Sequence, residues 1–390
     1  MKKILFVIQS LRIGGAEKEQ VTLANRLVEA GYDVTILLWM PYFDLQNELD
    51  ERVHVIYKPQ DQHLGNKIPY IRHKYYDDVM WLLRAKPAQL YRYYVGRENY
   101  DIEIAFFHSW AVNIVSGSTN KKAVHIAWIH RDIKTNPDQT EITPEMREMY
   151  KNFDHIVCVS KAAYDSYIEM IGDTGNVQTI YNLIPIDQVL ELAEKQPPVK
   201  VERSSFHAVM VGRLTHAKGY DRLIRVVVAL RNEGKDISLT LVGAEDPQPA
   251  LDMIAENSAG SYISLIHNDK NPFPYIKGSD LLVCPSHSEG YNLTVAEALI
   301  LGVPVLSTDC SGPVEILDGG KYGMIVENSE EGLYRGLKQL YEDRALLEEY
   351  RKKAIERRGF FDEEKIFKQI TDLFEQEKES WKSCFLSPRH

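Results

Sequence analysis

Short apolar runs alternate with longer amphipathic stretches through the first half of the chain. The runs occupy residues 3–8, 34–39, 53–57, 101–107, 123–129, 155–159 and 177–181. Runs of this length with little internal alternation are typical of parallel strands that are buried on both faces. Residues 18–30 have helical periodicity and end at Gly31, a residue favoured just past a helix end. The pattern therefore predicts a first domain of alternating strands and helices around a parallel sheet.

A proline-rich polar stretch at residues 183–205 interrupts this pattern, which then restarts. New apolar runs occupy residues 206–211, 237–242, 262–266, 281–284 and 303–307, with an amphipathic stretch at 220–232. We expect an α/β protein with two Rossmann-like domains, the first over residues 1–190 and the second over 191–365. From residue 330 the chain is predicted to be helical, with a break near Gly359. The last helix, within 366–390, is expected to pack back on the first domain.

The stretch from residue 286 to 309 contains a helix start flanked by two carboxylates. Asn292 is a good helix cap, and the helix predicted over 294–301 is stopped by Gly302 and Pro304. Free backbone N–H groups at such a start attract anions. Glu289 precedes the cap and Glu297 follows it, so each can bind a hydroxyl on one side of a bound anion. The alternative is a solvated loop carboxylate and an ordinary helix-face carboxylate.

In each half, a glycine-containing loop follows the first strand. In the loop at 212–219, Arg213 and Lys218 could clamp a diphosphate together with the amides of residues 292–294, unless they are only solvated surface charges. Gly14 and Gly15 lie in the first loop, which lacks the GxGxxG fingerprint. They either form the turn or allow a ligand to approach the backbone closely.

His130 follows the run at 123–129 directly. The carboxyl ends of parallel strands gather at one edge of a sheet, where open α/β folds bind ligands. A histidine at that position has either a structural or a catalytic role. Because other polar residues are expected at the same edge, both interpretations stay open.

Composition narrows the class of protein. The net charge of −10 argues against a dedicated nucleic-acid binder. No signal peptide and no run of about 18 apolar residues is visible, and the four cysteines form no CxxC pair, which suits a reducing cytoplasm. Residues 66–97 combine seven Lys or Arg with seven Tyr or Trp. This segment predicts contact with an anionic membrane surface, or else surface helices whose tyrosines pack on the sheet.

With these residues identified, nearly the whole chain resembles a retaining family 4 glycosyltransferase of the GT-B fold, in which two Rossmann-like domains face each other across a cleft. The resemblance rests on GGAEK at 14–18, VSK at 159–161, YN at 181–182, VGRLTHAKG at 211–219, SEGYNLTVAEAL at 288–299 and GVPV at 302–305.

The resemblance implies a role for each matching residue. Arg213 and Lys218 hold the diphosphate, and Leu293 and Thr294 offer it their amides. Glu297 binds ribose hydroxyls, and Glu289 binds hydroxyls of the donor sugar. His130 lies near the reaction centre, whereas Gly14, Gly15, Gly290, Tyr291, Asn292 and His267 complete the donor site, His267 on the side of the base.

The resemblance also shows two departures from the family pattern. Family members often have Phe-Gly where this chain has Tyr291-Asn292, and Leu183-Ile184-Pro185 follows Asn182 where proline commonly comes at once. No Asp-x-Asp metal motif occurs in the expected context, so we expect neither an essential metal nor another cofactor.

The function expected from these observations is transfer of a sugar, with retention, from a nucleoside-diphosphate sugar, with UDP the favoured nucleotide. The acceptor is expected to be a glycan or a lipid-linked glycan of the cell envelope, and the protein to be cytoplasmic, in part at the inner face of the membrane. Two alternatives remain: a non-catalytic partner subunit that binds glycan or protein, and a nucleotide-sugar epimerase on the same fold.

Overall fold

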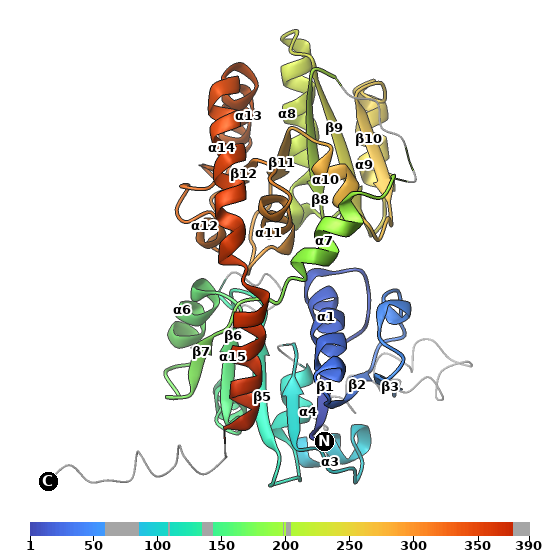
Figure 1. The fold of residues 1–390 in the computed structure, drawn as a ribbon, viewed down its shortest axis with the longest axis vertical. Coiled ribbons are helices and arrows are strands. Elements are labelled where there is room, and N and C mark those ends of the chain that lie inside the picture. The colour runs from blue at the N-terminus through green and yellow to red at the C-terminus, as the bar shows by residue number, and fades with distance from the viewer. Residues whose placement is uncertain (59–85, 108–109, 135–142, 198, 200–203, 377–390) are drawn as a thin grey trace, which may run out of the picture. The chain divides into compact units, whose positions relative to one another are not determined.

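The computed structural model describes residues 1–58, 86–107, 110–134, 143–197, 199 and 204–376. The chain forms two compact units (Figure 1). The first contains Met1–Arg12, Ala16–Tyr181 and the segment that begins at Phe367, and the second contains Ile13–Gly15 and Asn182–Ile366. Both units are α/β, as the alternating pattern predicts.

The first unit is built on a parallel sheet of seven strands in the order β3-β2-β1-β4-β5-β6-β7. Its strands are β1 (Lys3–Ile8), β2 (Asp33–Leu38), β3 (His54–Tyr57), β4 (Ile102–Ala105), β5 (Val124–Ile129), β6 (His155–Cys158) and β7 (Val177–Thr179). The sequence order reverses between β1 and β4, which pair in parallel. Ligands bind at such a reversal, beside the carboxyl ends of the strands.

The described helices of this unit are α1 (Gly15–Glu29), α3 (Pro87–Tyr94), α4 (Trp110–Ser116), α5 (Pro144–Tyr150), α6 (Lys161–Met170) and α15 (Glu363–Glu375), with the short 3-10 helix η1 (Gln46–Glu48). Helix α1 begins three residues before the predicted start at Lys18. In β1 the side chains from Ile4 to Ile8 are almost completely buried. The strand therefore has apolar residues on both faces, as the unbroken apolar run indicates.

The second unit has a parallel sheet of six strands in the order β10-β9-β8-β11-β12-β13, which reverses between β8 and β11. Its strands are β8 (Phe206–Val211), β9 (Ile237–Gly243), β10 (Ile263–His267), β11 (Leu281–Cys284), β12 (Val305–Thr308) and β13 (Met324–Val326). Its helices are α7 (Ile186–Ala193), η2 (His216–Lys218), α8 (Tyr220–Asn232), α9 (Gln248–Glu256), α10 (Phe273–Lys277), α11 (Leu293–Ile300), α12 (Ser311–Ile316), α13 (Glu330–Glu342), α14 (Arg344–Arg357) and η3 (Arg358–Phe360).

The change from the first unit to the second falls at Tyr181 and Asn182, before the boundary expected at residue 190. Helix α7 packs against α10 and α11 of the second unit. The Asn271 side-chain amide also donates to the Leu192 carbonyl at 3.0 Å. The proline-rich stretch at 183–205 therefore contains a helix that is a packed element of the second unit.

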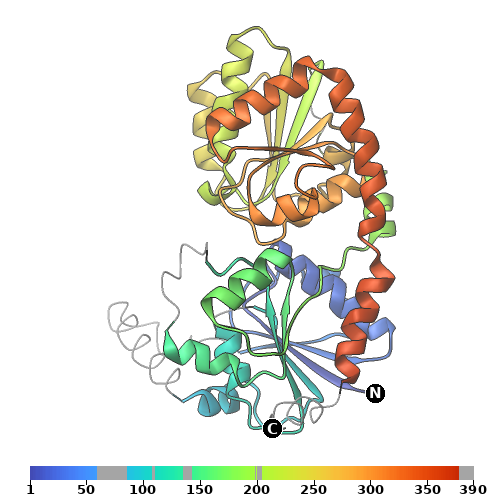
Figure 2. The ribbon, with the colours of Figure 1, turned by 90° about the vertical axis from the view of Figure 1, so that its left-hand side faces the viewer.

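Helix α15 groups with the first unit from Phe367 on, and Figure 2 shows it as the last red helix before the C-terminal grey trace. Lys2 Nζ donates to the Phe374 carbonyl at 2.9 Å and pairs with the Glu375 carboxylate at 2.8 Å. Ile370, Leu373 and Phe374 on the same helix are at most 1% exposed. Since α15 follows η3, the helical tail breaks near Gly359, as predicted, and it breaks a second time at Asp343, the cap of α14.

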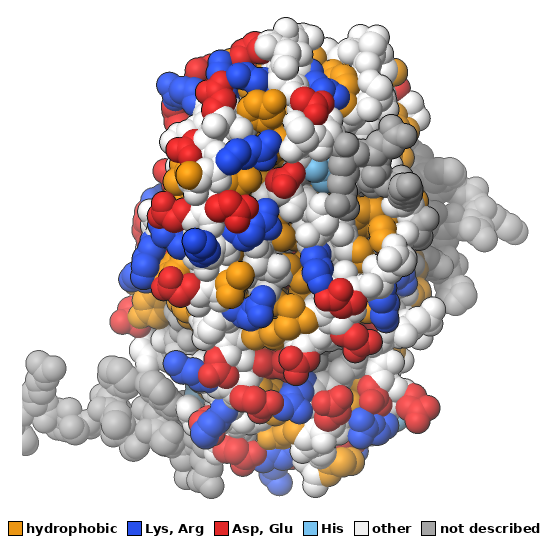
Figure 3. Space-filling view, turned by 45° about the horizontal axis from the view of Figure 1, so that its top comes forward, with side chains coloured by type: hydrophobic (Ala, Val, Ile, Leu, Met, Phe, Trp, Pro, Cys, Tyr) orange, Lys and Arg blue, Asp and Glu red, His pale blue; other side chains and the backbone are white. Residues whose placement is uncertain are grey.

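Charges of both signs lie interspersed over the described part of the face in Figure 3. No helix in the described ranges is long and apolar enough to cross a membrane.

Leu373→Ala is expected to lower the free energy of unfolding by about 2–5 kcal/mol, because it opens a cavity beneath α15. Lys368→Ala on the same helix serves as the control. Among the described residues Lys368 forms an ion pair only with Asp372, and both side chains are more than half exposed, so its loss should cost less than about 0.5 kcal/mol. Urea unfolding followed by circular dichroism measures both. Equal effects would show that α15 is not packed as described.

Candidate active site

The loop between β11 and α11 is shaped by a left-handed residue. Asn292 has φ +83°, and its Oδ1 accepts a hydrogen bond from the Val295 amide at 3.0 Å. Its Nδ2 also donates to Cys284 Sγ at 3.1 Å, which ties the start of α11 to the end of β11. The prediction that Asn292 caps this helix is confirmed. Helix α11 begins at Leu293, one residue before the predicted start.

The same geometry explains why asparagine can replace the glycine common in the family. Left-handed backbone is costly for most L-residues, and asparagine tolerates it better than other side chains. Asparagine also supplies a capping oxygen, which glycine lacks. Asn292 therefore keeps the backbone that a glycine would adopt and adds two side-chain contacts.

Lys218 and Glu289 are brought together at this loop. Lys218 Nζ lies 2.6 Å and 2.8 Å from the two carboxylate oxygens of Glu289, with side-chain exposures of 25% and 7%. Ser286 Oγ donates to the same carboxylate at 2.5 Å. The basic loop and the first carboxylate thus form one cluster beside the start of α11.

Close backbone packing fixes the basic loop against the end of β11. Gly219 has φ +71°, and a Cβ there would lie 1.9 Å from the Pro285 carbonyl oxygen. The buried Arg222 donates to the carbonyls of Pro285 and Ser286, each at 2.7 Å. Only glycine fits this approach, which places Lys218 within reach of Glu289.

Arg213 is positioned differently from Lys218. Its Nη1 lies 4.0 Å from Glu245 Oε1, and its side chain is 47% exposed. His267, at the end of β10, is exposed, and its Nε2 lies 2.8 Å from the Glu245 carbonyl oxygen. Arg213 and His267 therefore share Glu245 as a neighbour at the carboxyl edge of the second sheet.

The remaining predicted donor residues lie on or next to α11. Leu293 and Thr294 form its first turn, and Glu297 follows within the helix at 8% exposure. Gly290 and Tyr291 precede the cap, and Tyr291 is 3% exposed. The Glu289 carbonyl accepts from Ser311 Oγ at 2.9 Å, so the start of α12 also supports this loop.

The thiols behind the loop are packing groups. Burial raises the pKa of the Cys284 thiol and raises that of Cys310 to about 12. Both are therefore protonated and chemically quiet near neutral pH. Cys158, in the first unit, is a free buried thiol too.

In the first unit, His130 follows β5, and its side chain is only 5% exposed. Its Nδ1 lies 3.3 Å from Oε2 of Glu19, which is on α1. Its ring packs on Phe106, with centroids 4.5 Å apart. Gly14 and Gly15 lie where the loop after β1 leads into α1. His130 is thus at the carboxyl edge of the first sheet, as predicted.

Glu19, Ser286 and Arg222 were not predicted to belong to the site. The signal for Glu19 was a carboxylate at a core-facing position of an amphipathic helix, just before Gln20 and Val21, all three of which are buried. The role of Ser286 and Arg222 depends on backbone carbonyls and distant partners, which the sequence pattern does not reveal.

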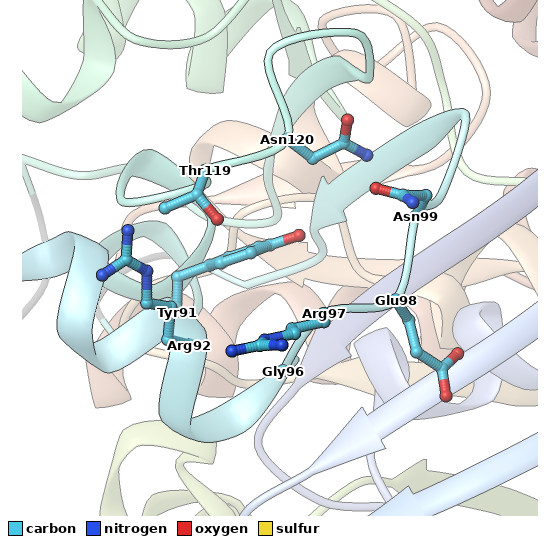
Figure 4. A pocket seen from close by; sticks show the side chains of 8 residues that line it. All are labelled: Tyr91, Arg92, Gly96, Arg97, Glu98, Asn99, Thr119 and Asn120. Atoms are coloured by element: carbon cyan, nitrogen blue, oxygen red, sulfur yellow. The ribbon is translucent and has the colours of Figure 1, made fainter.

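A cavity of about 680 Å³ lies elsewhere in the first unit (Figure 4). It is lined by Tyr91, Arg92, Gly96, Arg97, Glu98, Asn99, Thr119 and Asn120. These residues precede β4 and β5, whereas His130 follows β5. The cavity therefore opens at the amino edge of the sheet, away from the predicted site.

Most of the basic and aromatic segment at 66–97 lies outside the described residues. In the part that is described, Tyr91 and Tyr94 are at most 2% exposed and belong to the core, whereas Tyr93 is 51% exposed. The tyrosines of α3 thus divide between the core and the surface.

Comparison with known proteins identifies the family. Residues 13–188 match the model described as Glycosyltransferase Family 4, and residues 193–357 match Glycosyl transferases group 1. The chain belongs to the family 4 type of glycosyltransferases, which these two models describe together. It is therefore a transferase, and its two Rossmann-like domains are those of the GT-B fold.

Its relatives include an uncharacterized glycosyltransferase of Haemophilus influenzae, 26% identical over 86% of this chain and 90% of the relative. Another is an N-acetylgalactosamine-N,N'-diacetylbacillosaminyl-diphospho-undecaprenol 4-alpha-N-acetylgalactosaminyltransferase of Campylobacter jejuni, 24% identical over 94% of this chain and 97% of the relative. Among solved structures, HepE of Anabaena in complex with UDP-glucose has a TM-score of 0.70 at 18% identity, over 96% of this chain and 99% of HepE.

Asn292→Ala is expected to lower the free energy of unfolding by about 1–3 kcal/mol, because alanine loses the cap and must still adopt a positive φ. Asn292→Gly keeps the backbone conformation and should cost only a few tenths of a kcal/mol. Chemical denaturation of the two variants measures both free energies of unfolding. Equal losses of stability would mean that tolerance of the left-handed backbone is not what asparagine provides here.

Proposed function

We propose that this transferase moves a sugar, with retention, from a UDP-sugar to a lipid-linked glycan in the assembly of a cell-surface polysaccharide. The observation that carries the proposal is the cluster of Lys218, Glu289 and Ser286 beside the capped start of α11. It combines a cation from the loop after β8 with a buried carboxylate beside the first backbone amides of a helix.

In this proposal the leaving diphosphate is stabilised by the second unit. Lysine has three donors, and two suffice for the contacts to Glu289, so a third is left for a phosphate oxygen. Arg213 and the amides of Leu293 and Thr294 add further donors. Charge that develops on the leaving group then meets groups already in place.

The carboxylates serve hydroxyl groups of the donor. Glu289 is anchored by Lys218 and Ser286, so its oxygens are fixed in direction for the donor sugar. Glu297, further along α11, is assigned to the ribose. His267 is assigned to the side of the base, and Gly290 to the loop that holds the donor. Gly14 and Gly15 admit the ligand near the backbone, and His130 contacts the donor sugar.

Retention without a covalent sugar intermediate is the mechanism we propose. Retaining hydrolases use a carboxylate nucleophile about 5–5.5 Å from a second carboxyl group. Here Glu289 is held by a lysine and a serine, which suits binding better than attack. Front-face transfer, in which the leaving phosphate accepts the acceptor proton, needs no further base.

The nature of the donor and acceptor is supported by the relatives. HepE was solved with UDP-glucose, and the Campylobacter enzyme is named for a sugar carried on diphospho-undecaprenol. An acceptor of that class lies in a membrane, so we also propose that the protein works in the cytoplasm at the inner membrane face, and that basic residues of the segment 66–97 contribute to membrane contact. The donor site is proposed to work without metal. No cluster of three or more potential metal ligands occurs in the described ranges.

UDP and the matching UDP-sugar are expected to raise the melting temperature in buffer that contains EDTA. Ligand stabilisation grows as RT ln(1 + [L]/Kd), about 2.7 kcal/mol at 100-fold excess over Kd. A thermal-shift screen of UDP-, GDP- and ADP-sugars measures it. Stabilisation only after Mg²⁺ or Mn²⁺ is added would contradict the metal-free site. Release of UDP without acceptor, together with inversion of configuration at one carbon of the sugar, would favour the epimerase.

Lys218→Ala and Glu289→Gln are each expected to lower transfer at least 100-fold, since each removes a group that contacts the donor. Lys235→Ala is the matched control. Lys235 also forms an ion pair, with Glu342, and its side chain is 24% exposed, close to the 25% of Lys218. Rates of UDP release with acceptor present compare the three variants, and thermal melts check that they fold. Wild-type rates in Lys218→Ala would remove the basis of the proposal.

A further inference from the structure

Glu19 of α1 lies beside the histidine that the proposed function places near the donor sugar. We propose that Glu19 is a positioning residue, which fixes the orientation and the proton of the His130 ring. This inference rests on the proposed function for its catalytic consequence, although the pairing itself can be tested without any transfer.

The geometry singles out one nitrogen of the ring. His130 Nδ1 lies 3.3 Å from Glu19 Oε2, with side-chain exposures of 5% and 0%. Phe106 packs against the ring at 4.5 Å between centroids, and Phe107 lies near parallel to it at 6.5 Å. The ring thus has a carboxylate beside one nitrogen and two phenylalanine rings packed around it.

The other nitrogen, Nε2, is buried and has no hydrogen-bond partner within the described part of the chain. A buried ring nitrogen without a partner is costly, and such groups are rare in native proteins. Because His130 lies at the carboxyl edge of the sheet, a ligand hydroxyl bound at that edge is the partner that fits.

A carboxylate next to Nδ1 favours the proton on that nitrogen, because the contact makes the N–H form more stable there. Nε2 then carries the lone pair and accepts a hydrogen bond from a sugar hydroxyl. With the opposite tautomer, Nε2 would present an N–H and could not accept. Glu19 thereby sets what His130 can do without touching the sugar itself.

A buried carboxylate also requires a reason to lie on the core face of a helix. Removing a charge from water costs several kcal/mol unless it is paired. An apolar side chain at this position of α1 would pack without that cost. The chain instead has a carboxylate, next to a histidine at the ligand edge, which favours a role in the site over a role in stability.

The first unit contains a second buried pair, which provides an internal comparison. Glu103 Oε2 lies 3.4 Å from His125 Nε2, with exposures of 0% and 6%. Glu103 also accepts from the Tyr91 hydroxyl at 2.7 Å. Glu103 and His125 lie near the amino ends of β4 and β5, so this pair is at the edge opposite His130.

The test compares Glu19→Gln with Glu103→Gln, alone and with His130→Ala. Glu19→Gln is expected to lower kcat by about 10–100-fold, the range known for partners that orient metal-binding histidines, with little change in the donor KM. In the His130→Ala background it should have no further effect. Glu103→Gln removes an equally buried carboxylate and should leave kcat unchanged, whatever it does to the melting temperature.

The second readout is independent of transfer. In protein labelled with ¹⁵N-histidine, the His130 ring nitrogens, assigned by their absence in His130→Ala, should show the proton on Nδ1. Glu19→Gln should shift those resonances, and Glu103→Gln should not. A wild-type ring with its proton on Nε2, or equal kcat losses with and without His130, would overturn the proposal. If wild-type protein transfers no sugar, the proposed function fails, and the ring resonances still decide whether Glu19 positions His130.

Discussion

The site in the second unit depends on how the buried Arg222 holds the end of β11. Its guanidinium donates to the carbonyls of Pro285 and Ser286 and to Asn328 Oδ1 at 2.7–2.9 Å. Burial lowers the pKa of this guanidinium, which nevertheless stays charged because its ordinary pKa is so high. A planar fork of donors suits carbonyls that face one way, so these hydrogen bonds restrain the backbone at the end of β11. Glu289 and Asn292 take their positions from that loop.

The same constraint brings together groups that lie far apart in the chain. Gly219 allows the basic loop to touch the Pro285 carbonyl, and Lys218 then reaches a carboxylate that lies 71 residues further along the chain. The electrostatic pairing is therefore a consequence of close backbone packing rather than its cause. A bulkier residue at 219 would displace the lysine without changing any charge in the site.

Much of the fold could be predicted from the sequence, because buried parallel strands and amphipathic helices leave clear periodic patterns. Strand β1, strand β11 and the cap at Asn292 were all predicted. Helices α4 and α9 were not predicted. Helix α4 is short and nearly all buried, so it has no polar face to give a helical period. For the site, candidate residues could be named from the family resemblance and from the ends of the predicted strands. The sequence could not give their partners, because Ser286, Arg222 and Glu19 act through contacts that local spacing does not encode.

The two buried Glu–His pairs of the first unit show how position decides what similar chemistry does. Both have a carboxylate and an imidazole within 3.3–3.4 Å, and both are nearly inaccessible to water. Around His125, Asp154 lies 3.5 Å from the second ring nitrogen, and Tyr91 and Asn120 contact Glu103, so a protein carboxylate lies beside each ring nitrogen. Around His130, the second ring nitrogen has no partner among the described residues. A histidine with protein carboxylates beside both ring nitrogens is occupied by the fold itself, whereas one with a second nitrogen left open at the carboxyl edge of a sheet has room for a ligand.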